Sequence, residues 1–221
     1  MINILFTKIV DHSTLDKTYF SVNSYDFLSI EYFILKKKPF LNNNPLIFTS
    51  CNGFKGFLLN FRLDYLKKKI YVVGDKTFFY VKKYFPFSFF LKKNYVEDLI
   101  EEIIKEKSHQ NYDWFCGNKT KNLYTLKSNN INQYKVYQTT LIPRKIENLS
   151  HYNGIVFFSP SGVESFFLNN NIKNNIEVFA IGKTTAKFIS NFFLGDKKKI
   201  WYPLKPSLEK IFSLIKDIFK K

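Results

Sequence analysis

Short apolar segments alternate with amphipathic segments along this chain. Apolar, β-branched or aromatic runs bounded by Gly, Asn or Ser predict buried strands, and each run precedes a segment compatible with a helix. These runs are residues 3–6, 45–48, 70–73, 113–115, 154–158 and 177–181. Near the end, apolar residues recur at helical spacing from Ser207 to Lys221 and predict a core-packing helix. Alternating strands and helices are typical of an α/β fold with parallel sheets.

Two motifs occur twice in the same order. The copies are residues 47–54 with 156–163, and residues 72–77 with 180–185. In the first copy Gly53 and Gly74 are 21 residues apart. In the second copy Gly162 and Gly182 are 20 residues apart. Motifs repeated in order and at matched distance indicate two copies of one strand–turn–helix unit, one in each of two domains.

The repeated motifs place small polar residues and glycine between a strand and a helix. Residues of the N-cap type are Ser50, Asn52, Ser159 and Ser161, and we expect Thr77 and Thr185 where the second helices start. A helix N-terminus offers unpaired N–H groups and a positive dipole end, and glycine lets a ligand approach closely. Each residue alone is explained by capping. The duplicated set favours an anion-binding crevice beyond the carboxyl ends of the strands.

Composition excludes several other classes of protein. The chain has 221 residues, no apolar run long enough to span a membrane and no secretory leader, so we expect a cytoplasmic protein. Cys51 and Cys116 are too few for a disulfide framework and lack metal-ligand spacing. No histidine lies in a metal-ligand pattern, and the Walker, GxGxxG and HExxH motifs are absent from the sequence.

A net charge of +16 raises the alternative of a nucleic-acid-binding protein. Among 34 basic residues only Arg62 and Arg144 are arginines, and this bias indicates compositional drift toward lysine. Lysine runs at 36–38, 67–69 and 197–199 could bind phosphates. The tripeptide Lys55-Gly56-Phe57 begins like an RNA-recognition motif, but the residues that follow depart from it. A non-catalytic anion-binding protein of two domains is the second alternative.

Further segments match a known family. The stretches FFSPSGV at 157–163, FAIGKTTA at 179–186 and YKVYQT at 134–139 closely resemble hallmark stretches of uroporphyrinogen-III synthases. The segments at 47–53, 71–77 and 115–118 occur in that family's order and spacing. The resemblance covers nearly the whole chain.

The resemblance implies two parallel-sheet α/β domains, joined by a two-stranded linker, with an interdomain cleft. Domain 1 would combine residues 1–30 with 139–221, domain 2 would be residues 38–133, and residues 31–37 and 134–138 would be linker strands. The implied enzyme is a hydro-lyase of heme biosynthesis. It cyclises hydroxymethylbilane, a polycarboxylate, to uroporphyrinogen III with loss of water and inversion of ring D. We expect no cofactor, no metal, no nucleic-acid or membrane partner, and a monomer.

The resemblance also implies site residues. Tyr137 would be catalytic and would assist departure of the substrate hydroxyl, since a phenol is protonated at neutral pH. Residues expected to bind substrate are Thr7, Lys8, Thr49, Ser50, Asn52, Gly53, Gly74, Thr77, Cys116, Gly117, Asn118, Ser159, Ser161, Gly162, Gly182, Thr184 and Thr185. Lys8 stands where the family has arginine, so a bidentate carboxylate clamp is not expected there.

Overall fold

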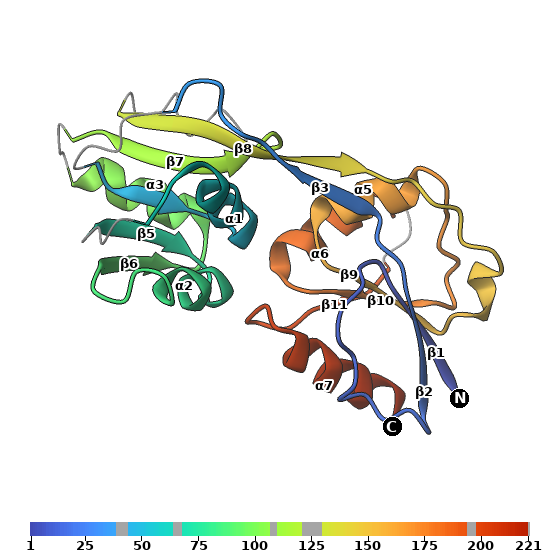
Figure 1. Cartoon of the computed structure of the whole chain (residues 1–221). Helices are drawn as coiled ribbons and strands as arrows, with labels where there is room; N and C mark the ends of the chain where they lie inside the picture. Colours follow the sequence, from blue (N-terminus) through green and yellow to red (C-terminus); the bar gives the residue numbers. More distant parts are fainter. Residues whose placement is uncertain (39–43, 64–67, 107–109, 121–129, 194–197, 221) are drawn as a thin grey trace. The chain divides into compact units, whose positions relative to one another are not determined.

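A computed structural model describes residues 1–38, 44–63, 68–106, 110–120, 130–193 and 198–220. By its internal contacts the chain forms two compact units. Unit 1 contains Met1–Ser29 and Thr140–Lys221, and unit 2 contains Ile30–Thr139. Each unit is built on one sheet with parallel strands and flanking helices, so the predicted α/β class is confirmed (Figure 1).

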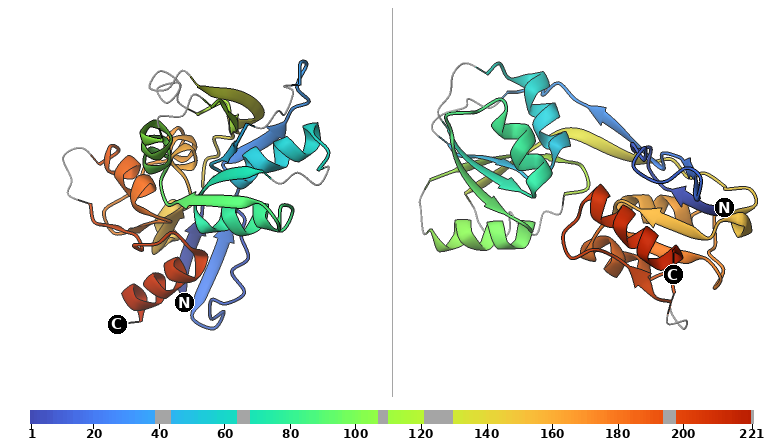
Figure 2. Two further views of the ribbon diagram at one scale, coloured as in Figure 1. Left: turned by 90° about the vertical axis from the view of Figure 1, so that its left-hand side faces the viewer. Right: turned by 90° about the horizontal axis from the view of Figure 1, so that it is seen from below.

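The sheet of unit 1 has helices on both faces. Its strand order is β11 (Ile200–Trp201), β10 (Glu177–Ala180), β9 (Gly154–Phe157), β1 (Ile2–Phe6) and β2 (Phe20–Ser24). Its helices are η1 (Leu149–His151), α5 (Pro160–Phe167), α6 (Lys183–Ser190) and α7 (Leu208–Phe219). Figures 1 and 2 show α5 and α6 on one face of the sheet and α7 on the other.

Alternation along β9 explains this layering. Ile155 and Phe157 pack in one apolar cluster with Phe166 of α5. Val156, between them, packs in another cluster with Ile211 of α7. Successive strand residues point to opposite faces, so a strand covered on both sides must be apolar throughout.

Unit 2 follows the same plan. Its strand order is β3 (Leu28–Tyr32), β8 (Ile131–Leu141), β7 (Tyr112–Gly117), β4 (Leu46–Phe48), β5 (Lys69–Val73) and β6 (Phe89–Lys93), and its helices are α1 (Cys51–Asn60), α2 (Asp75–Lys82) and α3 (Val96–Lys105). Leu46 and Phe48 pack with Phe57 of α1. Ile47 packs with Leu99 of α3 on the opposite face. The right-hand view of Figure 2 shows α3 on the other side of the sheet from α1 and α2.

The predicted motifs lie at one edge of each sheet. Strands β1, β9 and β10 are parallel neighbours, so their carboxyl ends meet at one edge of unit 1. Strands β5, β4, β7 and β8 are likewise parallel, and their carboxyl ends meet at one edge of unit 2. Each copy of the repeat therefore brings its two glycine motifs to the same edge of its own sheet.

Several details differ from the sequence prediction. β1 is not followed by a helix: residues 7–19 form turns and irregular backbone before β2. The first predicted linker strand, 31–37, is strand only to Tyr32, whereas β8 is longer than the predicted 134–138. Both predicted linker segments fall within unit 2 by contact. The helix expected after Asn118 falls partly on residues 121–129, outside the described residues.

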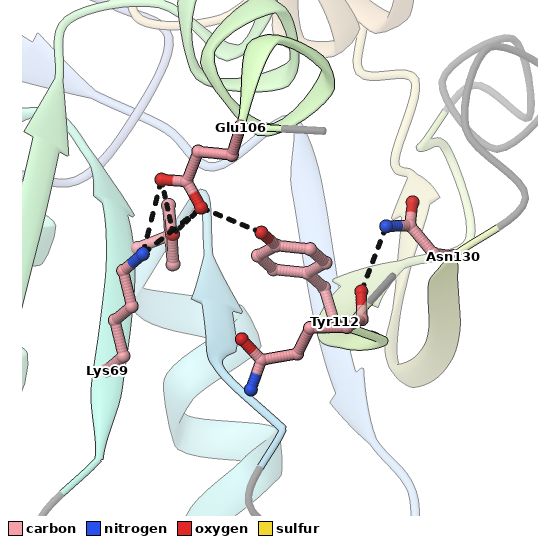
Figure 3. A network of polar contacts seen from close by, with 6 residues as sticks. Lys69, Glu106, Tyr112 and Asn130 are labelled. Carbon is pink, nitrogen blue, oxygen red and sulfur yellow. Dashed lines mark hydrogen bonds and ion pairs between the residues drawn. The ribbon is translucent and has the colours of Figure 1, made fainter. Parts of the chain in front are cut away.

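The opposite edge of the unit 2 sheet holds a polar network (Figure 3). The Glu106 carboxylate, just after α3, accepts hydrogen bonds from Lys69 Nζ, Tyr71 Oη and Tyr112 Oη at 2.8–3.2 Å. Burial acts to raise the pKa of Glu106, but these donors outweigh it and lower the pKa below its ordinary value. Lys69 and Tyr112 begin their strands, so the network lies at the amino ends, away from the glycine motifs.

Within the described ranges, no helix is long and apolar enough to cross a membrane. A search of the same ranges for groups of His, Cys, Asp or Glu that could hold a metal ion finds none.

Candidate active site

The N-terminus of α1 forms a corner with β4, which we call the α1 corner (residues 49–53). Ser50 is the N-cap, and its Oγ accepts a hydrogen bond from Gly53 N at 3.1 Å. A Cβ on Gly53 would lie 2.3 Å from the backbone oxygen of Phe115. Glycine is therefore required because α1 packs directly on the backbone of β7.

Tyr137 reaches this corner from β8. Its Oη lies 3.3 Å from Ser50 Oγ. Its ring occupies the space where Gly117 lacks a side chain, since a Cβ there would lie 2.5 Å from Tyr137 Cζ. Burial raises the pKa of Tyr137, and the hydrogen bond with Ser50 opposes that shift. The phenol is thus a protonated donor held beside a helix N-terminus.

Further polar groups surround the same corner. Tyr32 Oη donates to Asn52 Oδ1 at 2.9 Å, and the Tyr32 ring centroid lies 6.4 Å from that of Tyr137. Burial, with neighbouring Tyr137 and Cys51, raises the pKa of Tyr32. Tyr32 was missed in the sequence because only long-range pairing of β3 with β8 brings it here.

Trp114 was missed because only the long-range pairing of β7 with β4 brings it to this corner. Its Nε1 donates to Thr49 Oγ1 at 3.3 Å, so a buried β7 side chain holds the first hydroxyl of the α1 corner.

Unit 1 has a matching corner at α5, which we call the α5 corner (residues 159–162). Ser159 is the N-cap, and its Oγ accepts from Gly162 N at 3.1 Å. Thr7, buried at the end of β1, donates from Oγ1 to the Val156 carbonyl at 3.0 Å. Ser161 lies in the first turn and is half-buried. The repeat read from the sequence is therefore a repeat of capping geometry.

The second helix of each copy starts differently from the prediction. Glycines, not threonines, hold the N-cap positions: Gly74 precedes α2 and Gly182 precedes α6, without a side-chain cap bond. Gly74 has φ of 78°, a conformation that favours glycine. Thr77 and Thr185 lie inside the first turns with exposures of 5% and 4%. Their burial leaves backbone N–H groups as the donors at these two helix ends.

Thr184, Lys8 and Asn118 are exposed. Asn118 links β7 to β8, because its N–H donates to the Tyr137 carbonyl at 3.1 Å and its Oδ1 accepts from Thr139 N at 2.9 Å. Asn118 therefore fixes the strand that carries Tyr137.

Cys116 is buried in the cluster on the α3 face, and burial raises the pKa of its thiol. A raised pKa keeps the thiol protonated and unreactive, so Cys116 is a packing residue in this structure.

Two buried asparagines, one in each unit, are a further part of the repeat that the sequence analysis did not predict. Asn60 Nδ2 donates to the carbonyls of Gly56 and Phe33, both at 2.8 Å, and its Oδ1 accepts from Leu35 N at 2.7 Å.

Asn170 makes the equivalent bonds in unit 1. Its Nδ2 donates to Phe166 O at 2.9 Å and to Arg144 O at 2.7 Å, and its Oδ1 accepts from Ile146 N at 2.8 Å. Asn60 follows Ser50 by 10 residues and Asn170 follows Ser159 by 11, a signal that was present in the sequence.

The structure argues against an RNA-recognition motif at residues 55–57. Lys55, Gly56 and Phe57 lie within α1, and Phe57 is buried in the core. A Cβ on Gly56 would lie 2.6 Å from the Val136 carbonyl, so this glycine serves helix–strand packing. No aromatic of this tripeptide is available for stacking on a base.

Comparisons with known proteins agree with this architecture. The family model described as uroporphyrinogen-III synthase HemD matches residues 36–210. A search of curated proteins finds no match.

Solved structures of the same family share the fold. A uroporphyrinogen-III synthetase from Helicobacter pylori is similar at a TM-score of 0.66 and 19% identity, over 99% of this chain and 100% of that chain. A mutant uroporphyrinogen III synthase from Thermus thermophilus is similar at 0.68 and 12%, over 100% and 98%. The wild-type Thermus thermophilus enzyme in another crystal form gives 0.52 and 11%, over 100% and 98%. The chain belongs to the uroporphyrinogen-III synthase family, the lyases that form uroporphyrinogen III in heme biosynthesis.

Proposed function

We propose that this chain closes hydroxymethylbilane to uroporphyrinogen III, with Tyr137 as the group that assists loss of the substrate hydroxyl. The observation that carries the proposal is the Tyr137 phenol, held 3.3 Å from Ser50 Oγ at the α1 corner. Its pKa is raised by burial, so it keeps its proton at neutral pH and can donate it.

The proposed step conserves atoms and electrons. The bond between the hydroxymethyl carbon and its oxygen breaks, and the oxygen leaves as water with the phenol proton. The π electrons of the adjacent pyrrole form a double bond to that carbon and give an azafulvene cation. Loss of the ring-nitrogen proton to the phenolate restores Tyr137.

Substrate binding would rest mainly on backbone amides. The helix ends at Ser50, Gly74, Ser159 and Gly182 offer N–H groups to the carboxylates of the bilane. The remaining predicted binding residues lie at or beside the same strand ends. Ring inversion depends on folding a flexible polyanion into one shape, so orientation contributes more than acid–base strength.

We also propose that β3 and β8 act as linker strands. The chain passes from unit 1 to unit 2 after Ser29 and returns after Thr139, within these strands. The extended backbone of β3 and β8 at both crossings supports this role. That the protein is a cytoplasmic monomer without nucleic-acid partners stays a prediction.

A product assay tests the function. The purified chain receives bilane made in situ by the preceding deaminase, without added metal or nucleotide, and the porphyrin isomers are separated after oxidation. We expect mostly the inverted isomer, formed faster than in a heat-denatured control. Accumulation of only the uninverted isomer at the uncatalysed rate would contradict the proposed activity and support the alternative of a non-catalytic anion-binding protein. A salt-dependent gel shift with nucleic acid would instead support the other alternative.

A further inference from the structure

The hydroxyl of Ser50 has two neighbours at the α1 corner. Its Oγ accepts from Gly53 N at 3.1 Å and lies 3.3 Å from Tyr137 Oη. A serine hydroxyl has one proton and two acceptor lone pairs. Since the Gly53 amide occupies a lone pair, the Ser50 proton can be donated to the phenol oxygen.

The direction of this hydrogen bond decides what Tyr137 can do. If Tyr137 donated to Ser50, the phenol proton would be occupied. If Ser50 donates, the phenol proton is free for an external acceptor, and the phenolate that follows its transfer already has a donor. A hydrogen bond to the charged form of an acid lowers its pKa, which is the sense in which Ser50 acts on Tyr137.

The backbone keeps the two hydroxyls together. The Tyr137 ring lies against the bare Cα of Gly117, where a Cβ would be 2.9 Å from Tyr137 Oη. The carbonyl of Tyr137 accepts from Asn118 N at 3.1 Å, which fixes the strand at this residue. Ser50 is fixed in turn by its capping bond, so neither group needs to be ordered during the reaction.

The α5 corner provides an internal comparison. Ser159 has the same extended backbone as Ser50 and the same 3.1 Å capping distance. In the part of the chain that the structure describes, no hydrogen bond joins Ser159 Oγ to a phenol. Capping therefore explains the hydrogen bond of Ser159 Oγ, but it does not explain the contact of Ser50 Oγ with Tyr137.

We infer that Ser50 is a positioning residue, which donates its hydroxyl proton to Tyr137 Oη and so makes Tyr137 a stronger acid toward the leaving hydroxyl. This inference rests on the proposed function and deepens it. Ser50 then acts through Tyr137, whereas the sequence reading gave it a carboxylate contact.

Matched variants test the inference in the full chain. The control is Ser207, the N-cap of α7, whose Oγ accepts from Lys210 N at the same 3.1 Å. Ser50→Gly and Ser207→Gly each remove one hydroxyl, and glycine is tolerated at an N-cap, so both variants should fold. We expect Ser50→Gly to lower kcat about tenfold with KM nearly unchanged, as about one unit of phenol pKa would give. Ser207→Gly should keep kcat within about twofold, because Ser207 caps α7 and is not among the proposed site residues. Ser50→Thr, which keeps the hydroxyl, should restore most of the rate.

A double-mutant cycle separates Ser50 from other causes. In a Tyr137→Phe background, Ser50→Gly should lower kcat no further than Ser207→Gly does, because the group through which Ser50 acts is gone. An additional tenfold loss there would overturn the inference, as would equal kcat values for Ser50→Gly and Ser207→Gly in the parent chain.

A spectroscopic readout keeps this test separate from the proposed function. With ¹³Cζ-labelled tyrosine, the Tyr137 resonance is the one missing from Tyr137→Phe. It should shift in Ser50→Gly and stay in place in Ser207→Gly, whether or not the chain turns over bilane. An unmoved resonance in Ser50→Gly overturns the inference, whereas an inactive parent chain with a shifting resonance overturns the function alone.

Discussion

The α1 corner of unit 2 and the α5 corner of unit 1 can be compared atom by atom. Both have a serine N-cap in extended backbone, with Oγ 3.1 Å from a glycine nitrogen three residues later. Both helices end near a buried asparagine that binds a carbonyl and an N–H of a distant segment. The backbone design is therefore shared.

The surroundings of the two corners differ. Tyr137, Tyr32 and Trp114 bring phenol and indole donors to the α1 corner. At the α5 corner the nearby hydroxyl of Thr7 is buried and bound to a backbone carbonyl. The comparison teaches that one capping geometry can be used twice, while in the described part of the chain phenol and indole donors are added to one copy.

The largest difference should be in the tolerance of the two corner glycines. A methyl group on Gly53 would lie 2.3 Å from the Phe115 backbone oxygen, whereas one on Gly162 would meet Ser159 Oγ at 3.3 Å and Thr7 Oγ1 at 4.0 Å. We expect Gly53→Ala to lower the free energy of unfolding by about 3 kcal/mol. Gly162→Ala should change it by less than about 1 kcal/mol, because alanine also favours the helix. Urea titration of both variants measures this, and equal losses would contradict the packing difference.

The next largest difference between the two corners should be in their effect on kcat. Tyr137→Phe should lower kcat about a hundredfold, which corresponds to about 2.7 kcal/mol, because the leaving hydroxyl loses its donor. Product binding should change much less, since the phenyl ring still fills the space above Gly117. Tyr152→Phe, in unit 1, removes a phenol that accepts from Asn23 Nδ2 and is the matched control. Turnover of Tyr137→Phe equal to that of the parent chain would remove Tyr137 from the chemistry.

The parts that the sequence predicted share a physical reason. Strands β4 and β9 are covered on both faces, so their apolar runs are unambiguous. Ser50 and Ser159 act within three residues of themselves, so their caps follow from local pattern. Local signals and full burial are what a single sequence reports well.

The parts that were missed depend on distant or backbone features. Tyr32 reaches the α1 corner only through the packing of β3 beside β8. Gly74 takes the cap position that Thr77 was expected to mark, because its positive φ sets the helix start. β6 was missed because its FFLKK sequence, at the sheet edge, lacks strand alternation.

Replacement of the buried asparagines, Asn60 and Asn170, should destabilise the two units equally. Asn60→Ala leaves the N–H of half-buried Leu35 without its acceptor, and Asn170→Ala does the same to buried Ile146, which costs about 2 kcal/mol in each case. Both losses should agree within about 0.5 kcal/mol, because the two sets of hydrogen bonds match. Asn169→Ala, at an exposed neighbouring position, is the control and should be neutral. A large loss in one unit alone would mean that the two sets of hydrogen bonds match in geometry but not in their contribution to stability.

The smallest effect that we predict concerns acid. The pKa of Glu106 is lowered in the folded state, so its stabilisation is complete above the ordinary carboxyl pKa and disappears as the pH falls through the lowered value. Glu106→Gln should lower the free energy of unfolding of unit 2 by about 1 kcal/mol at neutral pH and by progressively less in acid. Trp114 lies in unit 2 and Trp201 in unit 1, so the single-tryptophan variants Trp201→Phe and Trp114→Phe report the two units separately by fluorescence. The Trp114 signal should respond to Glu106→Gln while the Trp201 signal does not. A loss that persists unchanged at low pH would assign the effect to packing and not to the charge of Glu106.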